Sequence, residues 1–203
     1  IATVLARSEN ATAAERASRV LRIVAHPASP IHFETTERVM VNVTGSRGND
    51  VMLGPKYGGA TFYGGEGDDE LRAVTVHENS RHFFYGGAGN DRLVGGGGRD
   101  VLDGGTGDDT ISGNAGRNRI FGGHGNDEIH DGDGSSVVHT GPGRNKVRLG
   151  GGNDTVHAGT GVNLIDPGPG AVVFVLAYGG VTHVSQWQAE QVYDLSAWPK
   201  PPE

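Results

Sequence analysis

Aspartate recurs along the chain as the last residue of a glycine-rich hexad, seen most cleanly over Gly86 to Asp91 as Gly-Gly-Ala-Gly-Asn-Asp. A carboxylate held in a tight turn is a ligand that Ca²⁺ favours, because this ion takes roughly six to eight oxygens, several of them anionic. Glycine permits the positive φ of such a turn and lets backbone carbonyls approach closely. The hexads therefore predict calcium chemistry.

The residue two places after each hexad is usually apolar, and this apolar column repeats every nine positions. In a stacked solenoid, positions one to six of each repeat form a turn, and positions seven to nine form a short strand that points only position eight inward. Two repeats then complete one coil, and repeats eighteen residues apart stack at roughly 4.8 Å. The unbroken column is Phe84, Leu93, Leu102, Ile111, Ile120, Ile129, Val138, Val147, Val156, Ile165 and Phe174.

Fourteen repeats can be counted, and they divide the chain into three parts. Residues 1–44 are expected to form an N-terminal flank, residues 45–175 the roll and residues 176–203 a C-terminal cap. Two irregularities interrupt the grid, an extra Gly54 and four extra residues from Ala73 to Val76, and the stacked turns must tolerate both.

The N-terminal flank holds two further elements. Ala11 to Val24 has the apolar spacing of an amphipathic helix, with a basic stripe on its other face that is best explained as a solvated surface. Ile31 to Val43 is expected to contain an extended segment that caps the first coil, because an open end of the roll would expose unpaired strand edges.

The repeat wording resembles the RTX (repeat-in-toxin) calcium-binding family over about two thirds of the chain. The resemblance implies an all-β fold, a parallel β-roll or right-handed β-solenoid of nonapeptide repeats. It also implies that calcium lies between turns on the same edge, held by position-six aspartates and by backbone carbonyls of the hexad glycines. The segment Tyr193 to Trp198 resembles the ending that closes the roll in the serralysin-type C-terminal domain.

Alternate repeats place their turns on opposite edges of the roll, and the two edges differ in position six. Calcium needs several anionic oxygens, so the first edge, with three consecutive pairs of aspartates, is expected to bind most of the ions. The structural alternative is that each aspartate only caps its own turn. Position six of the first edge is Asp50, Asp69, Asp91, Asp109, Asp127, Asn145 and Asn163; that of the second edge is Ala60, His82, Asp100, Asn118, Ser136, Asp154 and Val172.

The predicted metal ligands combine side chains of position six with carbonyls of hexad glycines. No pair on the second edge has two acids, so Asp100 with Asn118 is expected to hold at most a weak ion and Asp154 lacks an acidic neighbour. The full predicted set is Asp50, Asp69, Asp91, Asp109, Asp127, Asp100, Asn118, Asn145, Gly65, Gly67, Gly87, Gly89, Gly105, Gly107, Gly123 and Gly125.

Catalytic motifs are not expected in this chain. His77 and His82 are five residues apart rather than four, so they do not share a helix face as a zinc protease motif requires. No Gly-x-Ser-x-Gly elbow and no Gly-Lys-Ser/Thr phosphate loop occurs. The chain is therefore expected not to be an enzyme, although it could be the non-catalytic part of a larger exoenzyme or toxin.

The outward positions of the two sheets also differ. Polar residues dominate the sheet that follows the first edge, whereas the other sheet carries Phe83, Tyr85 and Phe121 among valines. An apolar row of this size is usually covered, so a flanking segment or a neighbouring domain is expected to pack on it. His139 and His157 fall in position nine of adjacent coils on this sheet and should be stacked neighbours.

Charge and composition narrow the range of partners. The net charge of −7 argues against nucleic acid and anionic membranes, no apolar run is long enough to span a bilayer, and cysteine is absent. Ile1 in place of methionine suggests a piece of a longer chain, so the rest of that polypeptide or a secretion apparatus is an expected partner. The resemblance implies a calcium-binding module of a secreted bacterial protein that folds on calcium after type I secretion. The alternatives are a recognition module for a polysaccharide, receptor or neighbouring domain, and the C-terminal part of an exoenzyme.

Overall fold

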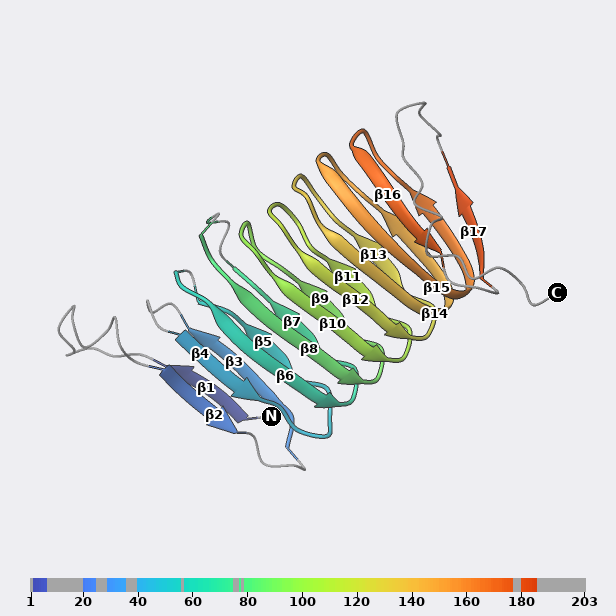
Figure 1. Ribbon diagram of the computed structural model, residues 1–203. Helices are drawn as coiled ribbons and strands as arrows, with labels where there is room; N and C mark the ends of the chain where they lie inside the picture. Colours follow the sequence, from blue (N-terminus) through green and yellow to red (C-terminus); the bar gives the residue numbers. More distant parts are fainter. Residues whose placement is uncertain are drawn as a thin grey trace.

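The chain forms one continuous stack of short parallel strands, as the computed structural model in Figure 1 shows. The structure describes residues 2–6, 20–24, 29–35, 40–55, 57–74, 77, 79–176 and 180–185. Every strand pairing in these residues is parallel, and each strand pairs with the strand one coil away, so the predicted all-β parallel roll is confirmed. None of the described residues forms a helix long and apolar enough to cross a bilayer.

Seventeen strands make up the described part of the stack. They are β1 (Ala2–Ala6), β2 (Val20–Val24), β3 (Ile31–Thr35), β4 (Met40–Thr44), β5 (Val51–Leu53), β6 (Ala60–Glu66), β7 (Glu70–Arg72), β8 (His82–Ala88), β9 (Arg92–Val94), β10 (Val101–Thr106), β11 (Thr110–Ser112), β12 (Arg119–His124), β13 (Glu128–His130), β14 (Val137–Arg148), β15 (Asn153–Asp166), β16 (Ala171–Leu176) and β17 (Val181–Val184).

The pairing register confirms a coil of two nine-residue repeats. Leu102 lies opposite Ile120, and Ile111 lies opposite Ile129, so partners on both sheets are eighteen residues apart. The two irregularities of the repeat pattern do not interrupt the parallel pairing of the strands. Phe62 pairs with Phe84 across the four-residue insertion, and the extra glycine at 54 sits between β5 and β6 without breaking the parallel ladder.

The core is a single column of position-eight side chains between the two sheets. The five three-residue strands (β5, β7, β9, β11 and β13) alternate as expected, with the middle residue buried and its neighbours half-buried or exposed. The Phe62 and Phe84 rings stack 5.0 Å apart at 5° within this column. Because the column is one residue wide, each coil buries little apolar area, and the turns must contribute to holding the coils together.

The predicted N-terminal helix is wrong where the structure describes it. Val20–Val24 forms β2, which pairs with β4, while residues 11–19 lie outside the described residues. The run Val-Leu-Arg-Ile-Val is rich in β-branched residues, and pairing with an existing sheet edge outweighs its helical spacing. The extended segment predicted at Ile31 to Val43 is confirmed as β3 and β4, with Phe33 and Val43 buried in the core. Its predicted role as a cap is wrong, because β1 and β2 pair with β3 and β4 on the side away from the repeats.

The apolar outer sheet has no described element lying over it. Phe83, Tyr85 and Phe121 are half-buried, as are Thr110 and Glu128 on the opposite face. The expectation that a flanking segment covers this sheet therefore finds no support in the described residues. The predicted closing segment from Tyr193 to Trp198 lies outside them, and the last described strand, β17, pairs with β15. His139 and His157 are stacked neighbours as expected, with ring centroids 4.3 Å apart.

Candidate metal centre along the turns

The position-six aspartates of the first edge link each coil to the one before it. In each pair, the backbone N–H of one position-six residue donates to the Oδ1 atom of the position-six residue in the next coil. The bond from Asp69 to Asp91 is 2.8 Å long, the bond from Asp91 to Asp109 is 2.7 Å and the bond from Asp109 to Asp127 is 3.0 Å. This ladder fixes one carboxylate oxygen of each aspartate and directs the second into the turn.

The second carboxylate oxygen is buried and lacks a hydrogen-bond partner among the described residues. This is true of Oδ2 of Asp69, Asp91, Asp109 and Asp127, whose residues are only 1–2 % exposed. An unpaired charged oxygen in such a place costs free energy unless a proton or a cation compensates it. A buried carboxylate oxygen that requires a proton or a cation therefore recurs in four consecutive coils.

Backbone oxygen lies close to each of these carboxylate oxygens. A Cβ built on Gly86 would contact Asp91 Oδ2 and would lie 2.6 Å from the carbonyl oxygen of Gly104 in the next coil. The same pairing of own-turn carboxylate and next-coil carbonyl recurs at Gly104, where the partners are Asp109 Oδ2 and the Gly122 carbonyl. Carboxylate and carbonyl oxygens that converge from two coils form a donor set suited to a hard divalent cation.

Burial sets the protonation behaviour of these aspartates. It raises the pKa of Asp69 and Asp109 to about 7 and that of Asp91 to about 6, with the charges of neighbouring aspartates acting in the same direction. Burial raises the pKa of Asp127 as well. Burial therefore shifts these aspartates toward the neutral acid relative to an exposed aspartate, and a bound cation would act in the opposite direction.

The asparagine turns at the C-terminal end of the first edge meet the same need without an ion. Asn145 Nδ2 donates to the carbonyl oxygen of Gly141 at 3.1 Å and to Asn163 Oδ1 at 3.2 Å, and Asn163 Nδ2 donates to the carbonyl oxygen of Gly159 at 3.0 Å. An N–H donor thus occupies the place that Oδ2 has in an aspartate turn. The geometry favours hydrogen bonding over the predicted ligand role of Asn145.

The close stacking of the turns explains why the eight predicted positions are glycine. All have positive φ, between 104° and 137°. The carbonyl oxygen of Gly65 faces Gly87 and that of Gly67 faces Gly89, so closely that a Cβ on the second glycine of either pair would collide with it. Position-two and position-four carbonyls therefore point along the edge from one turn to the next, where a shared ion would need oxygens.

Asp50 and Asp100 behave as turn caps rather than as open ligands. Asp50 Oδ2 accepts from the Ser46 backbone at 2.6 Å, and its Oδ1 accepts from the Ile31 backbone at 2.6 Å. Asp100 Oδ1 accepts from the His82 backbone at 2.9 Å, and its Oδ2 accepts from Gly96 at 2.6 Å. All four oxygens are thus paired with backbone donors, which favours the capping alternative at these two positions.

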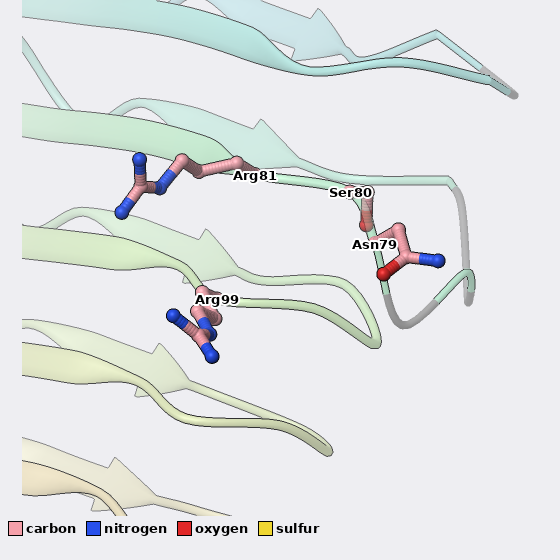
Figure 2. A pocket seen from close by; sticks show the side chains of 4 residues that line it. All are labelled: Asn79, Ser80, Arg81 and Arg99. Carbon is pink, nitrogen blue, oxygen red and sulfur yellow. The ribbon is translucent and has the colours of Figure 1, made fainter.

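The N-terminal half of the second edge is unsuited to a cation. His82 replaces the aspartate, is fully buried against Phe84, and has its pKa lowered by burial to about 4. Beside it lies a groove of about 570 Å³ into which Arg81 and Arg99 project from neighbouring coils, as Figure 2 shows. The two guanidinium groups repel a divalent cation, and the neutral imidazole of His82 supplies no negative charge to attract one.

Two features of the turns escaped the sequence analysis. One is a second column of side chains at position five of the first edge, where an Asn or Asp oxygen accepts from the backbone N–H one coil later. The bond from Asn90 to Asp68 and the bond from Asp108 to Asn90 are both 2.7 Å long. The signal was present as alternating Asn and Asp at 49, 68, 90, 108 and 126. The other is Asp131, whose carboxylate occupies a position that is normally glycine.

Comparison with known protein families agrees with this geometry. The family model for the RTX calcium-binding nonapeptide repeat matches in four copies, over residues 57–73, 83–111, 103–136 and 130–165. No curated protein and no solved structure matches the chain. The matched residues include all four first-edge aspartates with an unpartnered oxygen. Its parallel coils and these four matches identify the chain as a member of the RTX calcium-binding repeat family.

Proposed function

We propose that this chain is a calcium-binding β-roll module of a secreted bacterial protein, with its ions held along the first edge. The sites are the pairs Asp69/Asp91, Asp91/Asp109 and Asp109/Asp127, completed by backbone carbonyls of the hexad glycines. The observation that carries the proposal is the row of buried Oδ2 atoms that find no donor among the described residues. In this role the chain binds and folds and does not catalyse a reaction.

Calcium binding and folding are coupled in this proposal. The ion neutralises stacked carboxylates and joins successive turns, while the one-residue-wide core alone gives little stabilisation. Because the ion binds the folded turns and not the extended chain, its binding free energy adds to stability. A low calcium concentration in the cytosol would then keep the chain unfolded for type I secretion, and folding would follow outside the cell.

Circular dichroism with and without a chelator tests the coupling. We expect the β signal to be strong in calcium and to fall in EGTA, with the coils that use asparagine turns retaining part of it. Asp109→Asn should bind less calcium than the parent chain, because it removes a carboxylate from two sites. Asp108→Asn is the matched control, since this exposed neighbour lies in a column that already uses asparagine. An unchanged β signal in EGTA, or equal calcium binding by both variants, would contradict the proposal.

A second candidate function uses the outer sheet as a recognition surface. Tyr63 is 42 % exposed and stacks on Tyr85 at 5.0 Å, and Phe121 stacks on His139 at 4.9 Å. The two aromatic stacks are separated by Asp103, which pairs with Tyr85 on one side and Phe121 on the other. Sugar rings stack on aromatic faces of this kind, which favours a polysaccharide as the partner. Affinity electrophoresis in soluble polysaccharides, comparing the parent chain with Tyr63→Ala, tests it; equal migration of the two in every polymer would argue against this function.

A further inference from the structure

The second edge carries arginine at position five of three consecutive turns. Arg81, Arg99 and Arg117 are eighteen residues apart, and all three side chains are exposed. The position-six residues that follow them are joined from coil to coil by hydrogen bonds between a backbone N–H and a side-chain oxygen. The three arginines therefore form one column, called here the arginine column, with a spacing of roughly 4.8 Å per coil.

Position five of the first edge shows what these arginines replace. There an Asn or Asp oxygen accepts from a backbone N–H of the neighbouring coil, as Asn90 accepts from Asp108 at 2.7 Å. A guanidinium group has no acceptor, so an arginine cannot form this bond. Each arginine of the column thus gives up one link between coils.

The arginine column also places three like charges one coil apart. Like charges that face each other on neighbouring strands destabilise a sheet. Within the part of the chain that the structure describes, neither the column nor the exposed Arg119 at position seven has an ion pair, whereas Arg47 pairs with Glu66 and Arg92 with Glu70 on the other side of the roll. An anion lying across the column would relieve the repulsion.

A groove beside the first two arginines has room for such an anion. It has a volume of about 570 Å³ and is lined by Asn79, Ser80, Arg81 and Arg99, and Figure 2 shows the two arginine side chains extending from neighbouring coils. Guanidinium groups form charge-assisted hydrogen bonds with the oxygens of carboxylate, sulfate and phosphate groups, and the Asn79 amide is a further donor. The groove is therefore suited to an oxyanion.

Aromatic rings of the outer sheet lie next to two of these guanidinium groups. Arg81 lies over the Phe83 ring and Arg119 over the Phe121 ring, each with its Cζ atom 5.7 Å from the ring centroid. A ligand that contacts both kinds of group needs an apolar ring face and a negative charge, which is the chemistry of an acidic sugar. Nucleic acid is disfavoured, because the chain has a net charge of −7.

The acids of these coils do not pair with the arginine column. Asp100 is buried and accepts backbone N–H groups with both oxygens, and Asp131 accepts from Asn118. Asp103 lies at position nine of the outer sheet, four residues beyond Arg99. The anionic groups of a ligand are therefore best held at the turns and not over the middle of the sheet.

We propose that the second edge binds an acidic polysaccharide, whose carboxylate or sulfate groups lie on the arginine column and whose sugar rings rest on the neighbouring aromatic rings. The groove between Arg81 and Arg99 takes one anionic group, and Arg117 with Arg119 extends the contact along the coils. This inference rests on the second candidate function, and it adds the charge of the polysaccharide and the edge that holds it. It uses none of the first-edge aspartates.

Fluorescence anisotropy with three labelled polymers of one glucan backbone tests the proposal in saturating calcium. The parent chain should bind carboxymethyl dextran and dextran sulfate and should bind uncharged dextran more weakly. The triple variant Arg81→Gln, Arg99→Gln, Arg117→Gln should bind the charged polymers about tenfold more weakly, since each exposed ion pair contributes only a fraction of a kcal/mol. The matched control, Arg47→Gln, Arg92→Gln, Arg148→Gln, removes the same charge from arginines paired with acids, and it should bind like the parent.

The outcomes separate this inference from both proposed functions. Equal weakening in the two triple variants, or tighter binding of duplex DNA than of dextran sulfate, would overturn the inference. Binding of uncharged dextran alone would overturn it and leave the second candidate function standing. A parent chain that folds in calcium and binds none of the polymers would overturn both of these and leave calcium binding intact. Should the triple variant lose its β signal in calcium, Arg99→Gln against Arg92→Gln gives the comparison, and equal affinities there overturn the inference.

Discussion

The first edge contains two runs of turns that differ at one side-chain atom per coil. From Asp69 to Asp127, position six ends in an oxygen that lacks a donor among the described residues; at Asn145 and Asn163 it ends in an N–H group that bonds a backbone carbonyl of its own turn. The parallel pairing continues through both runs, with a local register irregularity at Gly141 in the first asparagine turn. A turn of this shape therefore needs a positive charge or a hydrogen-bond donor at the second terminal atom of the position-six side chain. An ion can supply the charge where that residue is aspartate, and the amide group supplies the donor where it is asparagine.

Position six of the second edge shows a third arrangement, in which the side chain is already paired or is not an acid. Asp100 pairs both of its oxygens with backbone N–H groups, and His82 fills its position with a buried ring. The aspartates of the repeat are therefore not equivalent, although their motif is the same. Ion binding depends on whether the second oxygen is already paired.

Removing calcium should have the largest effect and should divide the first edge at Asp127. We expect hydrogen exchange, followed by mass spectrometry, to become fast in EGTA across Asp69 to Asp127. The coils at Asn145 and Asn163 should keep more of their protection, because their amides pair the turns without an ion. Uniform protection loss along the whole edge would contradict the distinction between the two runs.

The pH dependence of the calcium-free chain follows from the raised pKa values. Asp69, Asp91 and Asp109 have folded-state pKa values of about 6 to 7 against an ordinary 3.8, so the folded state binds protons more tightly than the unfolded chain. The stabilisation by protons is complete below about pH 4 and is lost as the pH rises through 6 to 7.

Thermal melts in EGTA measure this effect. The melting temperature should be higher at pH 5 than at pH 8, whereas with saturating calcium the advantage of the lower pH should shrink, because protons compete with the ion. A higher melting temperature at pH 8 in EGTA would show that the carboxylates are not strained when charged.

Asn145→Asp converts an amide turn into an aspartate turn. In EGTA we expect a loss of about 1–3 kcal/mol of unfolding free energy, because two hydrogen bonds disappear and a buried oxygen is left unpaired. Calcium should recover much of this loss by binding next to the new carboxylate. Chemical denaturation in EGTA and in calcium measures both, and Asn90→Asp, at an exposed position that neighbouring coils fill with Asp, is the control. Equal loss with and without calcium would contradict the interchange of ion and amide.

The charges on the strand faces should matter least. Lys146 Nζ lies 2.8 Å from Glu128 Oε1, but both side chains are about half exposed. Lys146→Ala should therefore change the unfolding free energy by less than about 1 kcal/mol, in calcium and in EGTA alike. A loss in chemical denaturation as large as that of Asn145→Asp would mean that the faces, and not the turns, dominate the electrostatics.

The nine-residue period predicted the coil, the inward column and the two edges, because the stacking of parallel coils repeats the same backbone geometry. It could not predict which aspartates remain unpaired. That depends on neighbours such as Ser46 and Gly96, whose backbone N–H groups bond Asp50 and Asp100. Asp131 was missed because it stands at a glycine position. The helix expected up to Val24 failed because β2 gains more from pairing with β4 than from its own helical spacing.

The most direct test is a crystal structure of the calcium-bound chain in which anomalous diffraction locates each ion. The account predicts ions between Asp69 and Asp91, between Asp91 and Asp109 and between Asp109 and Asp127. It predicts no ion at Asn145 or Asp100. A row of ions of equal occupancy along both edges, or an empty first edge between Asp69 and Asp127, would contradict it.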